Sequence, residues 1–477
     1  MNTIRILLWV ILVYYIALHA IYLLLLLIGS LQVRRYNRAI TFAEFRRIGE
    51  SRLSMPVSLI IPCFNEATII CSTIRNILRL TYPQFEVIVV SDGSTDGTME
   101  ILAESFKLRR VDRFGRRYIG TEQIRSVHES PDYPNLVVVD KVNGRRADAI
   151  NAGVAMARYP LLCVIDADCL LEPDALLHMA RPFLRDSRVA AVAGVVRPSN
   201  GLAVVDGEIV SKGFPRSLIG LNQEVEYARS FQWARIGLSR LRSMLCISGA
   251  LILIRKHLFE KIGGPWPDAI TDDIEFTMRL NRHIHDRRNK EDQKLVFVPD
   301  AVCYTEIPEK ISQYASQRNR WQRGTLQALW RNRGMIFNPR YGMTGLFGMP
   351  FFLIFEGLAA IVELSAWILM AVCLVLGIAT GFEIIGMIFL AYILGVFLSL
   401  SAVLITESGR LRSATWRDFW RLILAILIDN IGFHQFHLLC RVVGTVEYFF
   451  GRRDLGRQME RIGNNHPHHE AHPTPAT

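Results

Sequence analysis

The sequence lacks several features that would place it in other classes of protein. Its eight cysteines contain no Cys-x-x-Cys spacing, and no recognised nucleic-acid-binding motif occurs in its 477 residues. The formal net charge of +11 comes largely from basic residues beside apolar segments, as in loops that face the cytoplasm. We therefore do not expect a nucleic-acid partner, and most cysteines are expected to be reduced, small, buried side chains.

Charge is also absent from the N-terminal run between Ile6 and Leu31. About 20 apolar residues span a bilayer, so this run predicts a transmembrane anchor. A cleaved signal peptide would be shorter and would end in small residues, whereas this run ends in Gln32, Arg34 and Arg35.

A second apolar region begins near Gly342. Residues 353–379 and 384–406 are candidate spans separated by a short turn, so they predict a hairpin. Residues 422–450 are apolar but include charged residues such as Asp429, so this stretch is interpreted as interfacial or channel-lining.

Basic residues next to these segments place residues 32–340 in the cytoplasm. The predicted organisation is a transmembrane anchor (1–32), a cytoplasmic linker (33–55), an α/β domain (56–308), an interfacial helix region (309–341), transmembrane or interfacial helices (342–450) and a partly disordered cytoplasmic tail (451–477).

The α/β domain is predicted from alternating patterns. Such alternation favours a doubly wound parallel sheet, in which ligands bind outside the carboxyl ends of the strands. After Val189 fewer helices are expected, and this half should form the acceptor side. The expected strands are 57–62, 85–92, 136–140 and 161–168, and the expected helices are 66–80, 96–106 and 146–157.

Three groups of carboxylates lie near these expected strand ends or at a helix start. Alternation on a strand would put Asp166 and Asp168 on one side, where they could hold a hard cation such as Mg²⁺; a chance match or a helix cap is the alternative. Asp92 could accept hydrogen bonds from a base or ribose, or belong to a plain turn, with Thr95 or the carboxylate of Asp96 capping the next helix. Asp272 and Asp273 open a helix and supply either N-terminal charge or a general base.

A basic segment, Gln317-Arg318-Asn319-Arg320-Trp321, precedes the second apolar region. Its tryptophan could anchor the chain at the membrane interface, or it could stack on a sugar while an arginine contacts phosphate.

Together these motifs resemble the processive membrane branch of the inverting family 2 glycosyltransferases, which includes synthases of cellulose, chitin, hyaluronan and poly-N-acetylglucosamine. The resemblance covers roughly residues 55–330. It is carried by IPCFNE (61–66), VVSDGSTDGT (89–98), DADCLLEPDAL (166–176), TDDIEFTMRL (271–280) and QRNRW (317–321).

The resemblance implies a GT-A-type nucleotide-sugar-binding domain with a role for each matching residue. Asp273 would be the catalytic base, and Asp166 and Asp168 would hold the donor diphosphate through Mg²⁺ or Mn²⁺. The implied nucleotide-sugar site also includes Pro62, Asn65, Glu66, Asp92, Lys141 and Arg146, and the implied acceptor and diphosphate site includes Ser248, Gly249, Asp272, Gln317, Arg320 and Trp321.

The chain departs from the family pattern at several positions. Arg145 and Arg146 stand where the family has Gly and Lys, and Asp272 stands where it has Glu. Only one span precedes the domain, and no regulatory domain is apparent.

The implied function is elongation, and possibly export, of a polysaccharide at the bacterial inner membrane from a UDP-sugar, UDP-N-acetylglucosamine or UDP-glucose. The partners would be the donor, the growing glycan and the bilayer. Glu356, Glu363 and Trp367 share one helical face and could line a passage for the glycan, or Glu356 could lie at the membrane interface. The rival functions are transfer of a single sugar to a lipid or glycan acceptor, and a membrane scaffold with an inactive domain.

Overall fold

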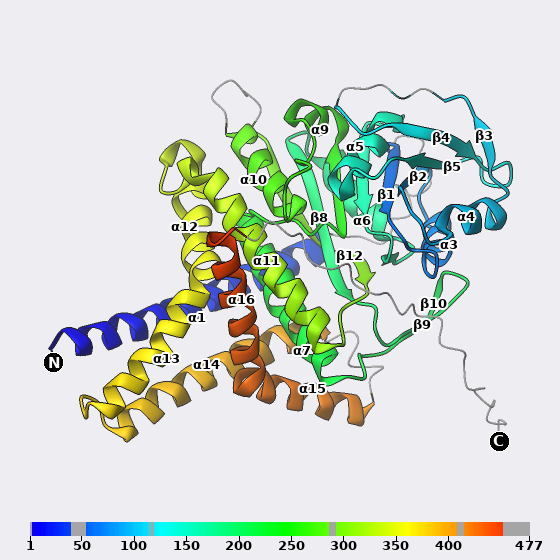
Figure 1. Ribbon diagram of the computed structural model, residues 1–477. Coiled ribbons are helices and arrows are strands. Elements are labelled where there is room, and N and C mark those ends of the chain that lie inside the picture. Colours follow the sequence, from blue (N-terminus) through cyan, green and yellow to red (C-terminus); the bar gives the residue numbers. More distant parts are fainter. Residues whose placement is uncertain are drawn as a thin grey trace, which may run out of the picture.

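The computed structural model describes residues 2–39, 54–113, 115, 119–285, 292–407 and 415–451. A large sheet with its covering helices forms one side of the molecule, and long helices extend from the other (Figure 1). Residues 40–53 of the predicted linker and residues 452–477 of the predicted tail lie outside the described residues.

Four parallel strands form the centre of the sheet, as the alternating pattern predicts. Strand β1 pairs with β2 and β6, and β2 pairs with β5, all in parallel. Their apolar side chains are buried almost without exception because helices cover both faces. These strands are β1 (Val57–Cys63), β2 (Phe85–Asp92), β5 (Leu136–Lys141) and β6 (Leu161–Ile165).

The rest of the ten-stranded sheet is mixed rather than purely parallel. Strand β11 (Leu251–Arg255) runs antiparallel to both β6 and β8 (Val189–Pro198), because the chain enters it from the opposite end. The sheet order is β3-β4-β5-β2-β1-β6-β11-β8-β12-β7, in which the remaining strands are β3 (Arg109–Val111), β4 (Ile124–Glu129), β7 (Leu170–Leu171) and β12 (Lys294–Thr305); a separate hairpin comprises β9 (Leu202–Val205) and β10 (Glu208–Lys212). The fold is a mixed α/β, GT-A-type sheet.

The helices of this domain begin close to the predicted positions, with two corrections near the first two strands. The backbone N–H groups of Glu66 and Ala67 donate to Thr98 Oγ1 and Asp96 Oδ2, so the chain turns here before the first helix. Asp96, not Thr95, accepts from the Thr98 N–H. The helices are α3 (Ile70–Leu78), α4 (Thr98–Ser105), α5 (Arg145–Met156), α6 (Ala175–Arg185), α7 (Leu218–Glu226), α8 (Ala234–Arg240), α9 (Lys256–Ile262), α10 (Asp272–Ile284) and α11 (Ile311–Arg331).

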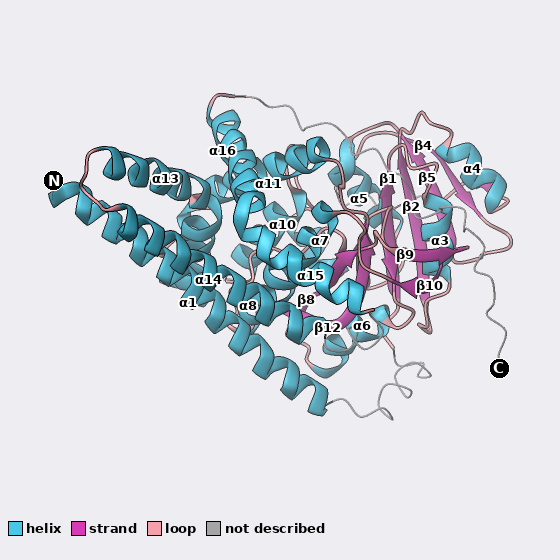
Figure 2. Cartoon of the chain, turned by 90° about the horizontal axis from the view of Figure 1, so that it is seen from below, coloured by secondary structure: helices cyan, strands magenta, loops and turns pink. Residues whose placement is uncertain are grey.

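Three helical segments among the described residues are long and apolar enough to cross a membrane, and a bent pair makes a fourth candidate. Of these, α1 (Asn2–Ala39), α13 (Ala359–Val375) and α14 (Gly381–Glu407) project together from the sheet domain (Figure 2). These findings indicate a membrane protein. The segments belong to α1 (Asn2–Ala39), α14 (Gly381–Glu407) and the pair α15 (Trp416–Ile428) and α16 (His434–Phe449); the bent pair includes α12 (Met349–Phe351) and α13 (Ala359–Val375).

Two of these segments are not continuous helices. The bent pair turns by 48° before α13, where Gln322 donates to the carbonyl of Gly357 and Arg441 to that of Glu356. Because these carbonyls accept hydrogen bonds from outside the helix, the regular backbone hydrogen bonds of a straight helix are not maintained here. The predicted continuous span 353–379 is therefore interrupted. Between α15 and α16, Ile431 and Gly432 leave the helical conformation.

Helix α1 is packed firmly onto the sheet domain through α8. Leu25 is fully buried, and its backbone approaches Gly237 so closely that a Cβ there would lie 2.7 Å from the Leu25 carbonyl oxygen. Trp233 packs in the same way over Gly29. The anchor and the domain therefore form one packed unit, which places the active-site face of the sheet next to the membrane helices.

Candidate active site

A single cavity of about 2160 Å³ connects the carboxyl ends of the central strands with the membrane helices. With one exception, Lys141, it is lined by every residue that the sequence predicts for the site. The lining includes Pro62, Asn65, Glu66, Asp92, Arg146, Asp166, Asp168, Ser248, Gly249, Asp272, Asp273, Gln317, Arg320 and Trp321. The carboxylates near the strand ends and those at the start of α10 thus lie in one cleft.

One part of the cavity is organised around Asp92 at the end of β2. The ammonium group of Lys141 donates to Asp92 Oδ1 at 2.6 Å and also pairs with Asp148. The Gly144 N–H donates to the same Asp92 oxygen at 3.0 Å. Lys141 is completely buried and lies behind the cavity lining, so in this structure it supports Asp92 and does not face a ligand.

The loop that follows β5 keeps the shape of a glycine turn although it contains an arginine. Arg145 has φ +74°, a left-handed conformation that L-residues rarely adopt. Asn143 donates to the backbone carbonyl of Asp92 at 2.7 Å and holds this loop against the end of β2. Arg145 therefore has a backbone conformation that glycine adopts more readily.

Asp166 and Asp168 lie in a turn directly after β6. They are not on the strand itself, so strand alternation is not what brings them together; the Cys169 N–H donates to the Asp166 carbonyl and closes the turn. One oxygen from each carboxylate and the Cys169 sulfur lie within 4.8 Å of one another. Asp168 Oδ2 also accepts from Thr305 Oγ1 at 3.0 Å. Two carboxylates that converge in this way suit a divalent cation.

Another part of the cavity is formed by the first turn of α10. Asp273 accepts from the backbone N–H groups of Gly249 at 3.2 Å and Ile274 at 2.8 Å. Burial raises the pKa of Asp273, and the neighbouring carboxylate of Asp272 raises it further. Such an environment favours a group that takes up a proton.

Two arginines lie among these carboxylates. Arg146 donates through Nε and Nη2 to Asp166 Oδ1, at 2.9 and 2.6 Å, and through Nη1 to Asp272. Burial lowers the pKa of Arg320, although the charges of Asp273 and Asp272 act in the opposite direction. Both arginines can meet the negative charge of a diphosphate.

Trp321 on α11 is held from behind by other side chains. The guanidinium of Arg318 lies 4.3 Å from the centre of its ring, and the ring of Phe231 lies 5.6 Å away. Arg318 is almost fully buried and pairs with Glu226 at 2.7 Å. The sequence analysis missed Arg318, Glu226 and Asp148, because nothing in their spacing reveals which distant residues they contact.

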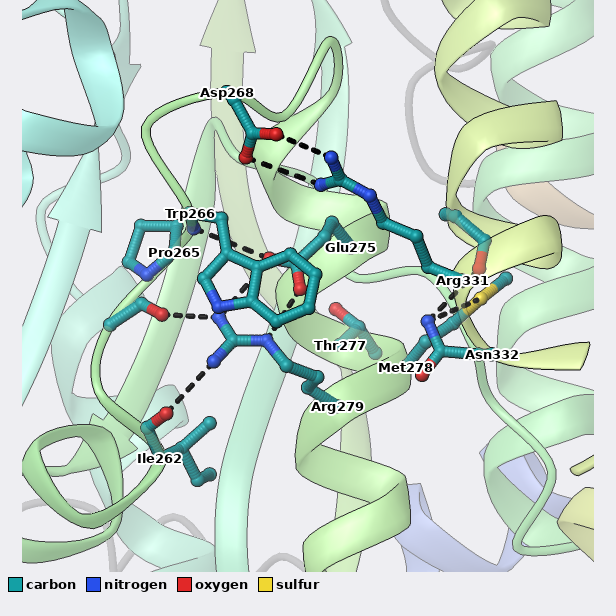
Figure 3. Close-up of polar contacts among 12 residues, drawn as sticks. Ile262, Pro265, Trp266, Asp268, Glu275, Thr277, Met278, Arg279, Arg331 and Asn332 are labelled. Carbon is teal, nitrogen blue, oxygen red and sulfur yellow. Dashed lines mark hydrogen bonds and ion pairs between the residues drawn. The ribbon is translucent and has the colours of Figure 1, made fainter. Parts of the chain in front are cut away.

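The start of α10 is braced on its other side (Figure 3). The Trp266 ring lies between two guanidinium groups, with Arg279 at 4.6 Å and Arg331 at 4.9 Å from its centre. Arg279 Nε donates to Glu275 Oε1 at 2.5 Å, and Arg331 pairs with Asp268. This arrangement fixes the loop that leads to the catalytic candidates Asp272 and Asp273.

The membrane end of the cavity contains paired polar groups. Tyr22 donates to Glu356 at 2.8 Å, and His434 pairs with Glu363 at 2.7 Å. Trp367 also lines this part of the cavity, so all three residues predicted for a passage face the same space. The sequence predicts the shared face of Glu356, Glu363 and Trp367, but not their partners on other helices.

The mixed sheet and its carboxylate-lined cavity define a GT-A-type glycosyltransferase. The family described as "Glycosyl transferase family 2" matches residues 58–263, and "Glycosyl transferase family group 2" matches residues 161–382. Residues 58–382 therefore contain a family 2 glycosyltransferase domain.

Several characterised proteins are similar to the chain. Poly-beta-1,6-N-acetyl-D-glucosamine synthase of Staphylococcus epidermidis is 26% identical over 342 residues, which is 72% of this chain and 69% of the relative. The synthase of the same name from Staphylococcus aureus (strain COL) is 27% identical over 58% of this chain and 56% of the relative. The structure of the mannosyltransferase PcManGT from Pyrobaculum calidifontis, in complex with GDP-Man and Mn²⁺, has a TM-score of 0.55 and 17% identity, and covers 93% of this chain and 99% of that chain. This last likeness concerns the fold.

Proposed function

We propose that the protein is a membrane-embedded, inverting polysaccharide synthase that transfers N-acetylglucosamine from UDP-N-acetylglucosamine to a growing glycan. The observation that carries this proposal is the single cavity shared by Asp168, Asp273 and Trp321. It supplies a cation site, a buried base and an aromatic platform for a sugar. The names of the similar synthases support the choice of sugar.

In this mechanism the acceptor hydroxyl lies beside Asp273, which accepts its proton as the hydroxyl attacks the anomeric carbon. Asp272 keeps the pKa of that base raised. Arg320 and Arg146 contact the departing diphosphate, and Asp92 orients the nucleoside. Attack opposite the diphosphate inverts the configuration of the sugar.

Asp166 and Asp168 would hold Mg²⁺ or Mn²⁺. Their converging oxygens fit a hard cation, and the thiol of Cys169 lies beside them. When bound, such an ion supplies positive charge that stabilises the leaving diphosphate.

The cavity continues from Trp321 toward Glu356, Glu363 and Trp367, so we propose that the membrane end receives the elongated glycan and exports it. The flanking basic residues favour a multi-pass protein of the bacterial inner membrane with the domain, 56–308, and the interfacial region, 309–341, in the cytoplasm. In the same arrangement, residues 1–32 form the anchor and residues 342–450 the remaining membrane helices.

The test is to incubate membranes that contain the protein with a panel of UDP-sugars and GDP-mannose, and to measure nucleotide release and product length. We expect UDP release with UDP-N-acetylglucosamine and a ladder of long products. Release with no UDP-sugar would contradict the donor, and a product one sugar longer than its acceptor would favour the single-transfer alternative. Membranes with the Asp273→Asn variant provide the background.

A further inference from the structure

One side chain, Arg146, joins the two halves of the site. It binds Asp166 after β6, Asp272 at the start of α10, and the carbonyl oxygen of Gly249 at 2.9 Å. A guanidinium presents its N–H groups as a rigid planar fork, so the three contacts are held in a fixed geometry relative to one another. The donor-side turn and the acceptor-side helix are therefore tied together by a single residue.

Arg146 is connected to Asp273 in two ways. Asp272 precedes it in the first turn of α10, and the backbone of Gly249 contacts both Arg146, through its carbonyl, and Asp273, through its N–H at 3.2 Å. A shift of Arg146 would consequently move the groups that orient the carboxylate of Asp273.

We propose that Arg146 is a positioning residue that holds α10 and its base against the end of β6 through Asp272. The inference rests on the proposed function in one respect, namely that Asp273 is the base. It goes beyond a cationic contact with the donor, because it assigns the Arg146–Asp272 pair a role in setting the geometry of the acceptor side.

The two departures from the family pattern meet in this pair. Arg146 stands in place of Lys and Asp272 in place of Glu, and the two side chains form an ion pair. A glutamate would carry its carboxylate one methylene farther, and a lysine would offer a single ammonium instead of a fork. Each departure therefore compensates for the other, and a single exchange back to the family residue should misplace the contact.

Arg146 also places its positive charge where a cation would bind. Two of its N–H groups occupy Asp166 Oδ1, so an ion entering between Asp166 and Asp168 must compete with the guanidinium. Binding of a divalent ion without nucleotide should therefore be weak, because the ion and the guanidinium compete for this carboxylate oxygen.

The experiment is a double-mutant cycle with Arg146→Lys, Asp272→Glu and the double exchange. We expect each single exchange to lower kcat/KM for nucleotide release by about tenfold, mainly through kcat, and the double exchange to recover most of that loss. The matched control is the same cycle at Arg79 and Asp206, a solvent-exposed pair with a 2.9 Å contact outside the cavity, where changes below about twofold are expected.

The second measurement needs no sugar donor. Mn²⁺ is titrated into the purified protein without nucleotide, and bound ion is followed by electron paramagnetic resonance. Arg146→Gln should bind Mn²⁺ at least about tenfold more tightly than the wild type. Multiplicative losses in the double exchange would overturn the positioning role, and unchanged Mn²⁺ affinity would overturn the competition.

The unfolding midpoint of each variant identifies one that does not fold. Asp272→Glu alone and the Mn²⁺ titration then still decide the question, since neither needs Arg146→Lys to be stable. Failure of the wild type to use UDP-N-acetylglucosamine would contradict the proposed donor, but it would leave the Mn²⁺ result and a cycle measured with the true donor intact.

Discussion

The two ends of the cavity are built in different ways. At the catalytic end, the carboxylates of Asp166, Asp168, Asp272 and Asp273 lie at a strand end and a helix start, and they outnumber the guanidiniums that face them. At the membrane end, acidic groups are matched by partners from other helices; Tyr22 and Glu356 are 334 positions apart in the chain. The first end is short of positive charge and the second is balanced.

This difference indicates different tasks. An excess of carboxylates gives this end a negative potential, which a cation and basic side chains can balance. Such a site suits the binding of a charged donor and the release of a charged product. Paired groups such as Asp429 and Arg229 neutralise one another and leave polar edges for a neutral ligand. A sugar chain could move past them without being held by net charge.

The largest expected effect is at the catalytic end. Asp273→Asn keeps the size of the side chain but removes the proton acceptor, so kcat should fall by about 10²- to 10⁴-fold, the usual contribution of general-base catalysis. Nucleotide affinity, measured by titration calorimetry with UDP, should change little. Asp132→Asn, at an exposed carboxylate outside the cavity, is the control, and near-normal turnover by Asp273→Asn would refute the base assignment.

Removal of divalent ions should give the next largest effect. Chelation with EDTA should lower nucleotide release by about 10²-fold or more, because stabilisation of the leaving diphosphate is worth several kcal/mol. Added Mg²⁺ or Mn²⁺ should restore the rate, and Asp168→Asn should not be restored at the same ion concentration. Activity that survives chelation would refute the cation role of Asp166 and Asp168.

The pH profile tests the environment of the base. Asp273 acts as a carboxylate, and burial followed by the charge of Asp272 raises its pKa above the value of about 3.9 for a free aspartate. The active form is therefore lost as pH falls through this raised pKa, by about tenfold in kcat/KM per pH unit below it. Asp272→Asn should shift that acid limb to lower pH. If the acid limb of the profile does not move, it reflects the titration of another group.

The same comparison explains what could be predicted from the sequence. Asp92 and Asp166 follow apolar strands, and parallel strands bring their carboxyl ends to one edge, so local pattern was enough to gather them. The antiparallel entry of β11 and the pairing of Lys141 with Asp148 depend on how distant segments pack, which no local spacing records.

At the membrane end, helical periodicity predicts one face for Glu356, Glu363 and Trp367; the structure bends between Glu356 and Glu363, and all three line the cavity. Their partners come from α1 and α16, and the bend before α13 arises because Gln322 and Arg441 bond to helix carbonyls. Such contacts are formed only when the helices pack against one another.

A smaller effect is expected at the membrane end. Glu363→Gln removes the charge that pairs with His434, and Trp367→Ala removes an aromatic wall, so the length of released product should fall by about two- to tenfold. The initial rate of nucleotide release should change by less than about twofold, because the catalytic groups are untouched. Trp420→Ala, at an exposed tryptophan outside the cavity, is the matched control. Unchanged product length in both variants would argue against the passage.

The smallest effect concerns the loop beside Asp92, where the catalytic end departs from the family pattern. Arg145 is held in the left-handed region, at a cost of roughly 1–2 kcal/mol that a glycine would not have. A glycine loses about 0.5–1 kcal/mol through the greater freedom of the unfolded chain, so Arg145→Gly should raise the free energy of unfolding by up to about 1 kcal/mol. Arg145→Ala keeps the strain and should show no such gain in thermal unfolding. Equal stability of the two variants would mean that the contacts of Asn143 and Gly144 with Asp92 fix the loop without measurable strain at position 145.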